Sequence, residues 1–419
     1  MAQDVSSERS TPFEVNGRTY HPSRRPIAVI CIDGCADEYL SVSIGAGSMP
    51  HLACMAAGGY RGFVRAALPT FTNVNNAAIV TGMPPSVTGI SGNFFLDPQT
   101  GQQVMMNSAS YLRCPTILAA AARAGRKVAM VTAKQKLTDI LSHDMEGIAF
   151  SAEKADEANL ERFGIDDVPQ FVGQPLPKIY SGDASVFVLR AGAALLRQQK
   201  SDFMYLSLTD YIQHKYPPEA DESLSFYSEL DEQIGCLIEM GAIVAITADH
   251  GMNAKNLRDG SPHVIYLQSF LDKHCPQAGS EVVCPITDPY VVHHGALGSL
   301  VMVHLKDLSR ISEVAQMILD LEGITEVYDR NTAAKKMQLP ADRIGDLVVL
   351  CGRDVALGRT ERDHDLSLLN GKLRTHGGRY EEMVPLVLSE SLTPLHTTLA
   401  QGDPRNFDVF DFVCNGVAI

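Results

Sequence analysis

The run Ile27-Ala-Val-Ile-Cys-Ile-Asp33 is a continuous apolar segment, rich in β-branched residues, that ends at a carboxylate. Such a run is typical of a strand that is buried on both faces, as in a parallel sheet. Two further runs have the same form, Phe203-Met-Tyr-Leu-Ser-Leu-Thr-Asp210 and Ala242-Ile-Val-Ala-Ile-Thr-Ala-Asp249. Because ligands of open α/β sheets bind outside the carboxyl ends of the strands, we expect the three carboxylates to converge there.

Histidines accompany two of these carboxylates. His250 directly follows Asp249, and His214 stands four residues after Asp210, which is one helical turn. A single aspartate after a strand is usually a turn or cap residue, but three of them with two histidines indicate a catalytic metal site. A late histidine, His376, lies in a glycine-rich segment whose backbone is free to bring its ring inward. The pattern predicts one ion held by Asp210, His214 and His376 and a second held by Asp33, Asp249 and His250.

The order of apolar patterns predicts the fold. Between residues 26 and 260, strand-like runs alternate with helical ones, which favours an α/β fold with a doubly wound, mostly parallel sheet. Beyond Gly260 the strand-like and helical runs alternate differently, and this region carries none of the predicted metal ligands. We therefore expect a small inserted α+β cap subdomain at 261–368. The chain then returns to the core at 369–419. Residues 1–25 are expected to be a polar lead-in.

Composition and charge limit the partners. The net charge of −14 argues against nucleic acid or an anionic membrane surface as the main partner. The nine cysteines are scattered without a CxxC pair, the N-terminal segment has no apolar signal-peptide core, and no stretch approaches the length of a membrane span. We therefore expect a reduced, cytoplasmic protein with a small-molecule partner, and a homodimer is left open.

A two-metal centre requires a nucleophile, and the polar segment before the apolar run 77–81 is the candidate. Thr70 and Thr72 both lie where a helix is expected to begin, and a helix N-terminus presents unpaired amides to a phosphoryl oxygen. From the residues alone, either threonine qualifies.

Together, these motifs resemble the alkaline phosphatase superfamily, in particular its nucleotide pyrophosphatase/phosphodiesterase-like branch. The resemblance covers residues 26–260 and 370–419 and departs at Val74, where many relatives have proline. The matching segments, in order, are Asp33, Thr70-Phe-Thr72-Asn-Val-Asn75, Thr81-Gly-Met-Pro-Pro-Ser-Val-Thr-Gly-Ile90-Ser-Gly-Asn93, Asp210 to His214, Asp249-His250-Gly251 and His376-Gly377.

The resemblance implies an alkaline phosphatase-like core that binds two zinc ions per subunit. It implies that Thr72 is the nucleophile and also reaches the zinc of Asp33, Asp249 and His250. The amide of Asn93 is expected to donate to a phosphoryl oxygen, and His214 to contact substrate as well as metal. A Cys- or Ser-x-Pro-x-Arg sulfatase motif is missing near residue 72, which favours phosphoryl over sulfuryl chemistry.

Two lysines narrow the choice of substrate. Lys134 and Lys136 follow the expected strand 127–133, and in an extended segment both would point to one side, toward the site. Two more positive charges suit a small, multiply charged anion. Within the branch, the Lys-x-Lys pair and the chain length resemble members that cleave the carbon–phosphorus bond of phosphonoacetate to acetate and phosphate through a phosphothreonine. A phosphodiesterase or nucleotide pyrophosphatase is the alternative, and a metal-dependent binding or scaffold protein without turnover is a third hypothesis.

Overall fold

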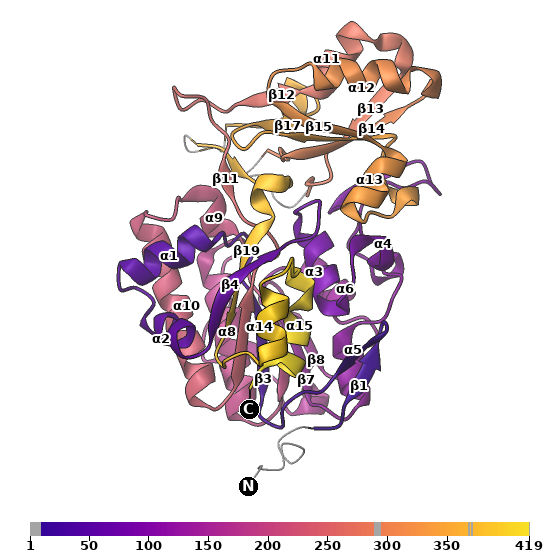
Figure 1. Ribbon diagram of the computed structural model, residues 1–419. Helices are drawn as coiled ribbons and strands as arrows, with labels where there is room; N and C mark the ends of the chain where they lie inside the picture. The colour runs from indigo at the N-terminus through magenta and orange to yellow at the C-terminus, as the bar shows by residue number, and fades with distance from the viewer. Residues whose placement is uncertain (1–9, 289–294, 368, 370–371, 419) are drawn as a thin grey trace.

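A seven-stranded sheet forms the centre of the larger part of the molecule (Figure 1). The structure is a computed structural model that describes residues 10–288, 295–367, 369 and 372–418. The five strands from β10 to β8 run parallel, while β19 is antiparallel to both of its neighbours, so the predicted mostly parallel α/β sheet is confirmed. In spatial order the strands are β4 (Tyr60–Arg65), β19 (Met383–Leu388), β10 (Ile243–Thr247), β3 (Ile27–Cys31), β9 (Phe203–Ser207), β7 (Val128–Thr132) and β8 (Ile148–Ser151).

The register of the central strands brings the predicted carboxylates to one edge. Every residue of β3, β9 and β10 is buried, as expected for apolar strands covered on both faces. Cys31 at the end of β3 lies opposite both Ser207 and Thr247, so the three strands end level with one another. Each buried aliphatic side chain contributes about 1.5–3 kcal/mol to folding.

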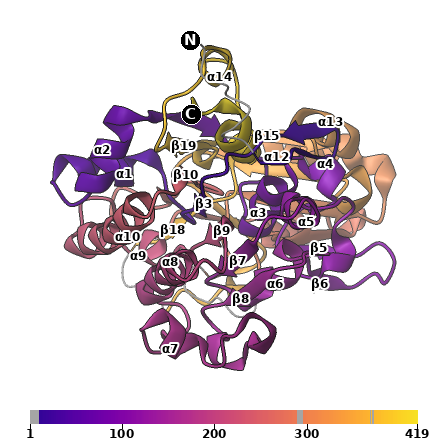
Figure 2. The ribbon, with the colours of Figure 1, turned by 90° about the horizontal axis from the view of Figure 1, so that it is seen from below.

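Helices cover both faces of the sheet (Figure 2). One face carries α1 (Asp37–Gly45), α2 (Pro50–Gly58), α8 (Gly182–Arg197) and α10 (Asp221–Glu239), and the other carries α3 (Thr72–Thr81), α5 (Ile117–Arg123) and α6 (Gln135–Leu141). The remaining core helices are α4 (Pro85–Thr88), α7 (Val168–Val172), α9 (Tyr211–Lys215), α14 (Pro394–Ala400) and α15 (Val409–Asp411), with a short hairpin of β5 (Phe94–Leu96) and β6 (Gln103–Met105). Within the described ranges, no single helix has the length and apolarity to cross a membrane, and α1 and α2 meet that measure only together, as a pair bent by 108°.

A second sheet, antiparallel throughout, is separate from the first and lies above it in Figure 1. The chain passes toward it from the carboxyl end of β10 through β11 (Asn253–Ala254) and returns through β18 (Arg374–Thr375), which pairs with β11. The predicted limits of the cap, 261–368, and of the core stay a prediction. The elements of this region are β12 (Val264–Tyr266), α11 (Leu267–His274), β13 (Ser280–Val283), β14 (Leu300–Leu305), α12 (Ile311–Leu319), β15 (Ile324–Asp329), α13 (Arg330–Met337), β16 (Leu347–Cys351) and β17 (Ala356–Gly358).

The N-terminal segment is more than the polar lead-in that we expected. Its described part contains a hairpin of β1 (Phe13–Val15) and β2 (Arg18–Tyr20), which are joined at Asn16 and Gly17 with φ of 53° and 75°. Positive φ at both positions, filled by Asn-Gly, is the usual signal for a tight hairpin. Tyr20 is fully buried, so this segment forms part of the core.

A buried ion pair joins the two chain crossings between the sheets. Lys255 follows β11 directly, and Glu381 follows the segment His376–Gly378, called here the His376 segment. Both side chains are fully buried, and Lys255 Nζ lies 2.9 Å from Glu381 Oε1. The Lys255 ammonium also donates to the Arg353 carbonyl at 2.6 Å, and Asn253 donates to Glu381 at 2.8 Å. Each charge is therefore fully compensated.

Removing one member of this pair is expected to be costly. Lys255→Met leaves the Glu381 carboxylate buried without its cation and should lower the free energy of unfolding by about 3–5 kcal/mol, measured by urea denaturation. The double variant Lys255→Met/Glu381→Gln removes both charges and keeps an acceptor oxygen, so it should recover most of that loss. A double variant as unstable as the single one would contradict this account.

Candidate active site

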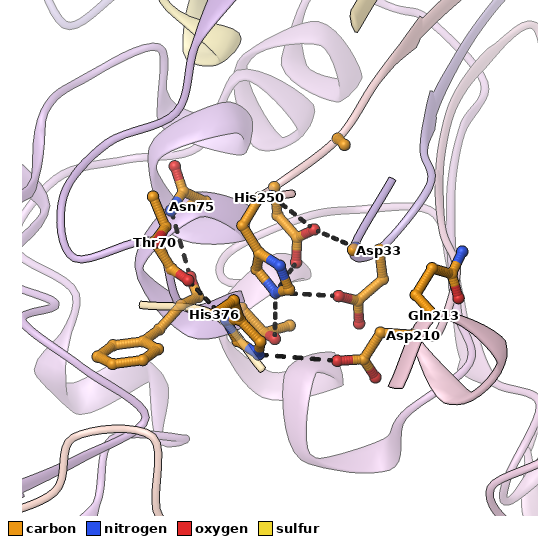
Figure 3. Close-up of polar contacts among 12 residues, drawn as sticks. Asp33, Thr70, Asn75, Asp210, Gln213, His250 and His376 are labelled. Carbon is orange, nitrogen blue, oxygen red and sulfur yellow. Dashed lines mark hydrogen bonds and ion pairs between the residues drawn. The ribbon is translucent and has the colours of Figure 1, made fainter. Parts of the chain in front are cut away.

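Three carboxylates meet at the carboxyl edge of the main sheet. Asp33, Asp210 and Asp249 follow β3, β9 and β10, and each is at most 4% exposed. In Figure 3 the rings of His250 and His376 point toward Asp33 and Asp210. The convergence expected from the three apolar runs is therefore present.

The first predicted ligand group is brought together. Single ligand atoms of Asp210, His214 and His376 all lie within 4.8 Å of one another. Asp210 Oδ2 lies 3.0 Å from His214 Nε2 and 3.9 Å from His376 Nε2. His214 comes from α9 and His376 from the loop after β18, so the group joins distant parts of the chain.

The second group differs in detail from the prediction. Ligand atoms of Asp33, Asp210 and His250 lie within 4.8 Å of one another, so Asp210 can reach both groups. Asp249 stands slightly further out, with Oδ2 at 3.7 Å from His250 Nε2. Its Oδ1 accepts backbone N–H groups from Gly34 and His250, which leaves Oδ2 as the oxygen nearer the site. The expected role of Asp249 as a metal ligand stays a prediction.

All three histidines are held in one tautomer by the backbone. His214 Nδ1 lies 2.7 Å from the Arg374 carbonyl oxygen, His376 Nδ1 lies 2.7 Å from that of Thr70, and His250 Nδ1 lies 2.9 Å from that of Gly251. A carbonyl only accepts, so Nδ1 carries the proton in each neutral ring and Nε2 keeps its lone pair. Each lone pair faces the carboxylates, an arrangement that metal-ligating histidines adopt.

The spacing of these atoms fits a tetrahedral cation. Asp33 Oδ1 is buried and accepts no hydrogen bond, although it lies 3.2 Å from His250 Nε2. Burial alone would lower the pKa of His250, but Asp249 and Asp33 outweigh it and raise the pKa to about 9, so a positive charge, from a proton or a metal ion, is favoured between these two atoms. Ligand atoms on a tetrahedral zinc, each about 2.0–2.1 Å from the ion, are roughly 3.3 Å apart. The donor set therefore fits a metal site.

The pKa shifts of Asp249 and His376 reflect the concentration of buried charge at this edge of the sheet. Burial, and then the neighbouring Asp33 carboxylate, raise the pKa of Asp249 to about 8. Burial lowers the pKa of His376 well below its usual value, and the His250 and His214 rings lower it further. A neutral His376 ring is the form that binds a metal.

Lys134 reaches the same carboxylates. Its ammonium lies 2.6 Å from Asp33 Oδ2 and 2.9 Å from Asp210 Oδ1, and the residue is 6% exposed. Burial alone would lower the pKa of Lys134, but Asp210 and Asp33 outweigh it and raise the pKa well above its usual value. Lys134 therefore stays charged beside the predicted ligands.

The extended segment expected at Lys134 and Lys136 is wrong, while the predicted contact of Lys136 with substrate stays a prediction. The strand ends at Thr132, Lys134 is the residue before α6, and Lys136 lies in its first turn. The Lys136 ammonium pairs with Asp288 from the region between β13 and β14. Both side chains are largely buried, so this pair joins the core to the second sheet.

The two candidate nucleophiles are distinguished by their contacts. The Thr70 hydroxyl donates to the Gly378 carbonyl and accepts from the Gly377 amide, both at 3.0 Å. Thr72 is the first residue of α3, and its Oγ1 lies 3.5 Å from His250 Nε2, facing the site. Thr72 therefore lies beside a predicted ligand, and its role as the nucleophile stays a prediction. Asn93 Oδ1 accepts a hydrogen bond from the backbone amide of Asn73. This contact leaves the NH2 group of Asn93 as the predicted donor to substrate.

One residue that supports the site was not found from the sequence. Asn76 is buried in α3 and donates to the Thr72 carbonyl at 3.1 Å and to Asp249 Oδ2 at 3.2 Å. Its oxygen accepts from the Tyr205 and Ser207 hydroxyls of β9. A polar residue in a fully buried helix is the signal that could have identified it, because a buried amide requires partners.

Known proteins are similar to this chain in sequence and fold. A family model described as type I phosphodiesterase / nucleotide pyrophosphatase matches residues 27–379. The crystal structures of phosphonoacetate hydrolase from Sinorhizobium meliloti 1021, in complex with phosphonoformate and with phosphonoacetate, are 42% identical to this chain with a TM-score of 0.92. The alignment covers 98% of this chain and 100% of that one.

A more distant structure shares the fold. Murine ectonucleotide pyrophosphatase / phosphodiesterase 5 is 17% identical with a TM-score of 0.62, over 94% of this chain and 96% of its own. The family predicted from the motifs is therefore confirmed. The chain belongs to the type I phosphodiesterase/nucleotide pyrophosphatase family of the alkaline phosphatase superfamily, and it is a hydrolytic enzyme.

Proposed function

We propose that this enzyme hydrolyses the carbon–phosphorus bond of phosphonoacetate to acetate and phosphate, with two zinc ions and a phosphothreonine intermediate. The observation that carries the proposal is the set of three histidine Nε2 lone pairs that face buried carboxylates beside Thr72. The 42% identity to phosphonoacetate hydrolase over 98% of the chain supports the choice of substrate.

The residues have separate roles in the proposed reaction. The two ligand groups would hold the zinc ions, which when bound would supply Lewis acidity for the phosphonate oxygens and for the Thr72 hydroxyl. Thr72, at the N-terminus of α3, attacks phosphorus, and the new oxygen–phosphorus bond replaces the carbon–phosphorus bond. The helix N-terminus and the Asn93 amide would stabilise the phosphoryl oxygens. Water then hydrolyses the phosphothreonine to phosphate and restores Thr72.

The leaving group explains the need for lysine. Cleavage leaves an electron pair on carbon, and the adjacent carboxylate delocalises it as an enediolate before a proton completes acetate. Lys134, already buried beside Asp33 and Asp210, would stabilise that charge. Lys136 can join it when the substrate carboxylate takes the place of Asp288 on its ammonium. Both roles are part of the proposal.

The family also contains phosphodiesterases, which gives the second candidate function. A turnover panel separates the two candidates: phosphonoacetate, phosphonopyruvate, 2-aminoethylphosphonate and a nitrophenyl phosphodiester. We expect phosphonoacetate to have the highest kcat/KM, with phosphate release as the measurement. An enzyme that cleaves the diester well and leaves phosphonoacetate untouched would favour the phosphodiesterase.

Thr72 can be tested apart from the metals. Thr72→Ala removes the attacking oxygen, so kcat for phosphonoacetate should fall by orders of magnitude, while zinc content measured by mass spectrometry largely remains. Thr70→Ser, which keeps a hydroxyl at the neighbouring threonine, is the matched control and should stay active. An active Thr72→Ala enzyme would disprove the covalent route.

Lys136 can be tested for selectivity. If its ammonium binds the substrate carboxylate, Lys136→Ala should lower kcat/KM for phosphonoacetate roughly ten- to hundredfold, because a charge-assisted contact is worth about 1.5–3 kcal/mol. Hydrolysis of a singly charged aryl phosphodiester should change much less. Lys154→Ala, which removes an exposed lysine paired with Glu157, is the control. Equal losses on both substrates would assign Lys136 to the phosphoryl group or to the fold.

A further inference from the structure

Thr70 is joined to the His376 segment by every polar atom that it carries. Its amide donates to the Gly377 carbonyl at 3.3 Å, and its own carbonyl accepts His376 Nδ1–H at 2.7 Å. Its hydroxyl accepts the Gly377 amide and donates to the Gly378 carbonyl, both at 3.0 Å. Thr70 is fully buried, so water cannot replace these bonds.

Packing against the Phe71 ring also holds the His376 segment in place. Gly377 has φ of 126°, and a Cβ at this position would lie 2.5 Å from the Phe71 ring. The Phe71 ring also meets the His376 ring edge-on, with centroids 5.7 Å apart. The backbone of the His376 segment is therefore held against residues 70 and 71 in a form that only glycine permits.

These contacts connect two parts of the site that lie 306 residues apart in sequence. Thr72, the proposed nucleophile, begins α3 two residues after Thr70. A displacement of the His376 segment would therefore move Nε2 of the last ligand and would also disturb the start of α3.

We propose that Thr70 is a positioning residue for the metal site. Its hydroxyl fixes the His376–Gly378 backbone, so that His376 Nε2 meets Asp210 and His214, and it ties this ligand group to Thr72. The polar side-chain contacts of Thr70 are with Gly377 and Gly378, and Thr70 is not one of the predicted ligands. This inference rests on the proposed two-metal function.

The test compares two near-isosteric variants. Thr70→Val replaces the hydroxyl with a methyl group and leaves the Gly377 amide without its acceptor, while Thr70→Ser keeps the hydroxyl. Loss of an outer contact that orients a ligand typically weakens metal binding 10–100-fold. In a zinc titration against a chromophoric chelator, we expect two sites in the wild type and in Thr70→Ser. In Thr70→Val, one of the two should be weaker by at least tenfold.

A second buried threonine controls for a general loss of stability. The Thr81 hydroxyl is fully buried and donates to the Ala77 carbonyl at 2.8 Å within α3, away from the His376 segment. Thr81→Val should lower the melting temperature yet bind both zinc ions as the wild type does. If Thr70→Val also keeps both affinities and only melts earlier, the positioning role is wrong.

A measurement on the unaltered enzyme covers the case in which Thr70→Val does not fold. Because coupling is reciprocal, zinc binding should slow hydrogen exchange of the Gly377 amide, which donates to the Thr70 hydroxyl. Unchanged exchange of that amide in the zinc-loaded protein would overturn the inference. A wild type that binds no zinc at all would instead remove the proposed function on which it rests.

Discussion

The mutual repulsion of three buried carboxylates is the constraint on which the site depends. Asp33, Asp210 and Asp249 follow strands that end level with one another, and none is more than 4% exposed. The raised pKa of Asp249, about 8, is caused by burial and by the charge of Asp33. Positive charge must be supplied at this edge, and the surrounding residues are arranged to supply it.

Two kinds of side chain face these carboxylates, a lysine that carries positive charge and histidines that can bind a metal ion. Lys134 brings an ammonium to Asp33 and Asp210, and the Nε2 atoms of three histidines face the same carboxylates. The carbonyls that hold Nδ1–H of His214 and His376 come from distant parts of the chain, so these two tautomers depend on the complete fold, whereas that of His250 is held by its neighbour Gly251. The arrangement resembles a preorganised metal site, in which ligand orientation is fixed before the ion binds.

The second sheet affects the site through a few buried contacts. Asp288 reaches Lys136 of α6, and the Lys255–Glu381 pair joins the two places where the chain crosses between the sheets. Glu381 also accepts the Gly378 amide at 3.0 Å, next to the segment that carries His376. The position of the second sheet and the geometry of the last ligand are therefore mechanically connected.

Local pattern was sufficient to predict part of this from the sequence. The three strand-ending carboxylates were found because a parallel strand requires a continuous apolar run, and His214 because four residues make one helical turn. The hairpin at Asn16-Gly17 carried a sufficient local signal and was missed.

Contacts between distant residues left no such signal. Nothing near Lys136 indicates that it pairs with Asp288, 152 residues away, and the choice between Thr70 and Thr72 depends on a segment more than 300 residues later. The extended segment expected at Lys134 and Lys136 is wrong because the strand ends at Thr132, one residue earlier than its apolar pattern suggests, and a helix begins at Gln135. These features depend on tertiary packing.

The central claim, that these ligands hold two zinc ions, can be tested by anomalous diffraction from a crystal of the zinc-loaded enzyme at the zinc absorption edge. We predict two peaks per chain, one about 2.0–2.1 Å from the Nε2 atoms of His214 and His376, and one at the same distance from that of His250. A map with no peak at these nitrogens in zinc-saturated crystals would contradict the account.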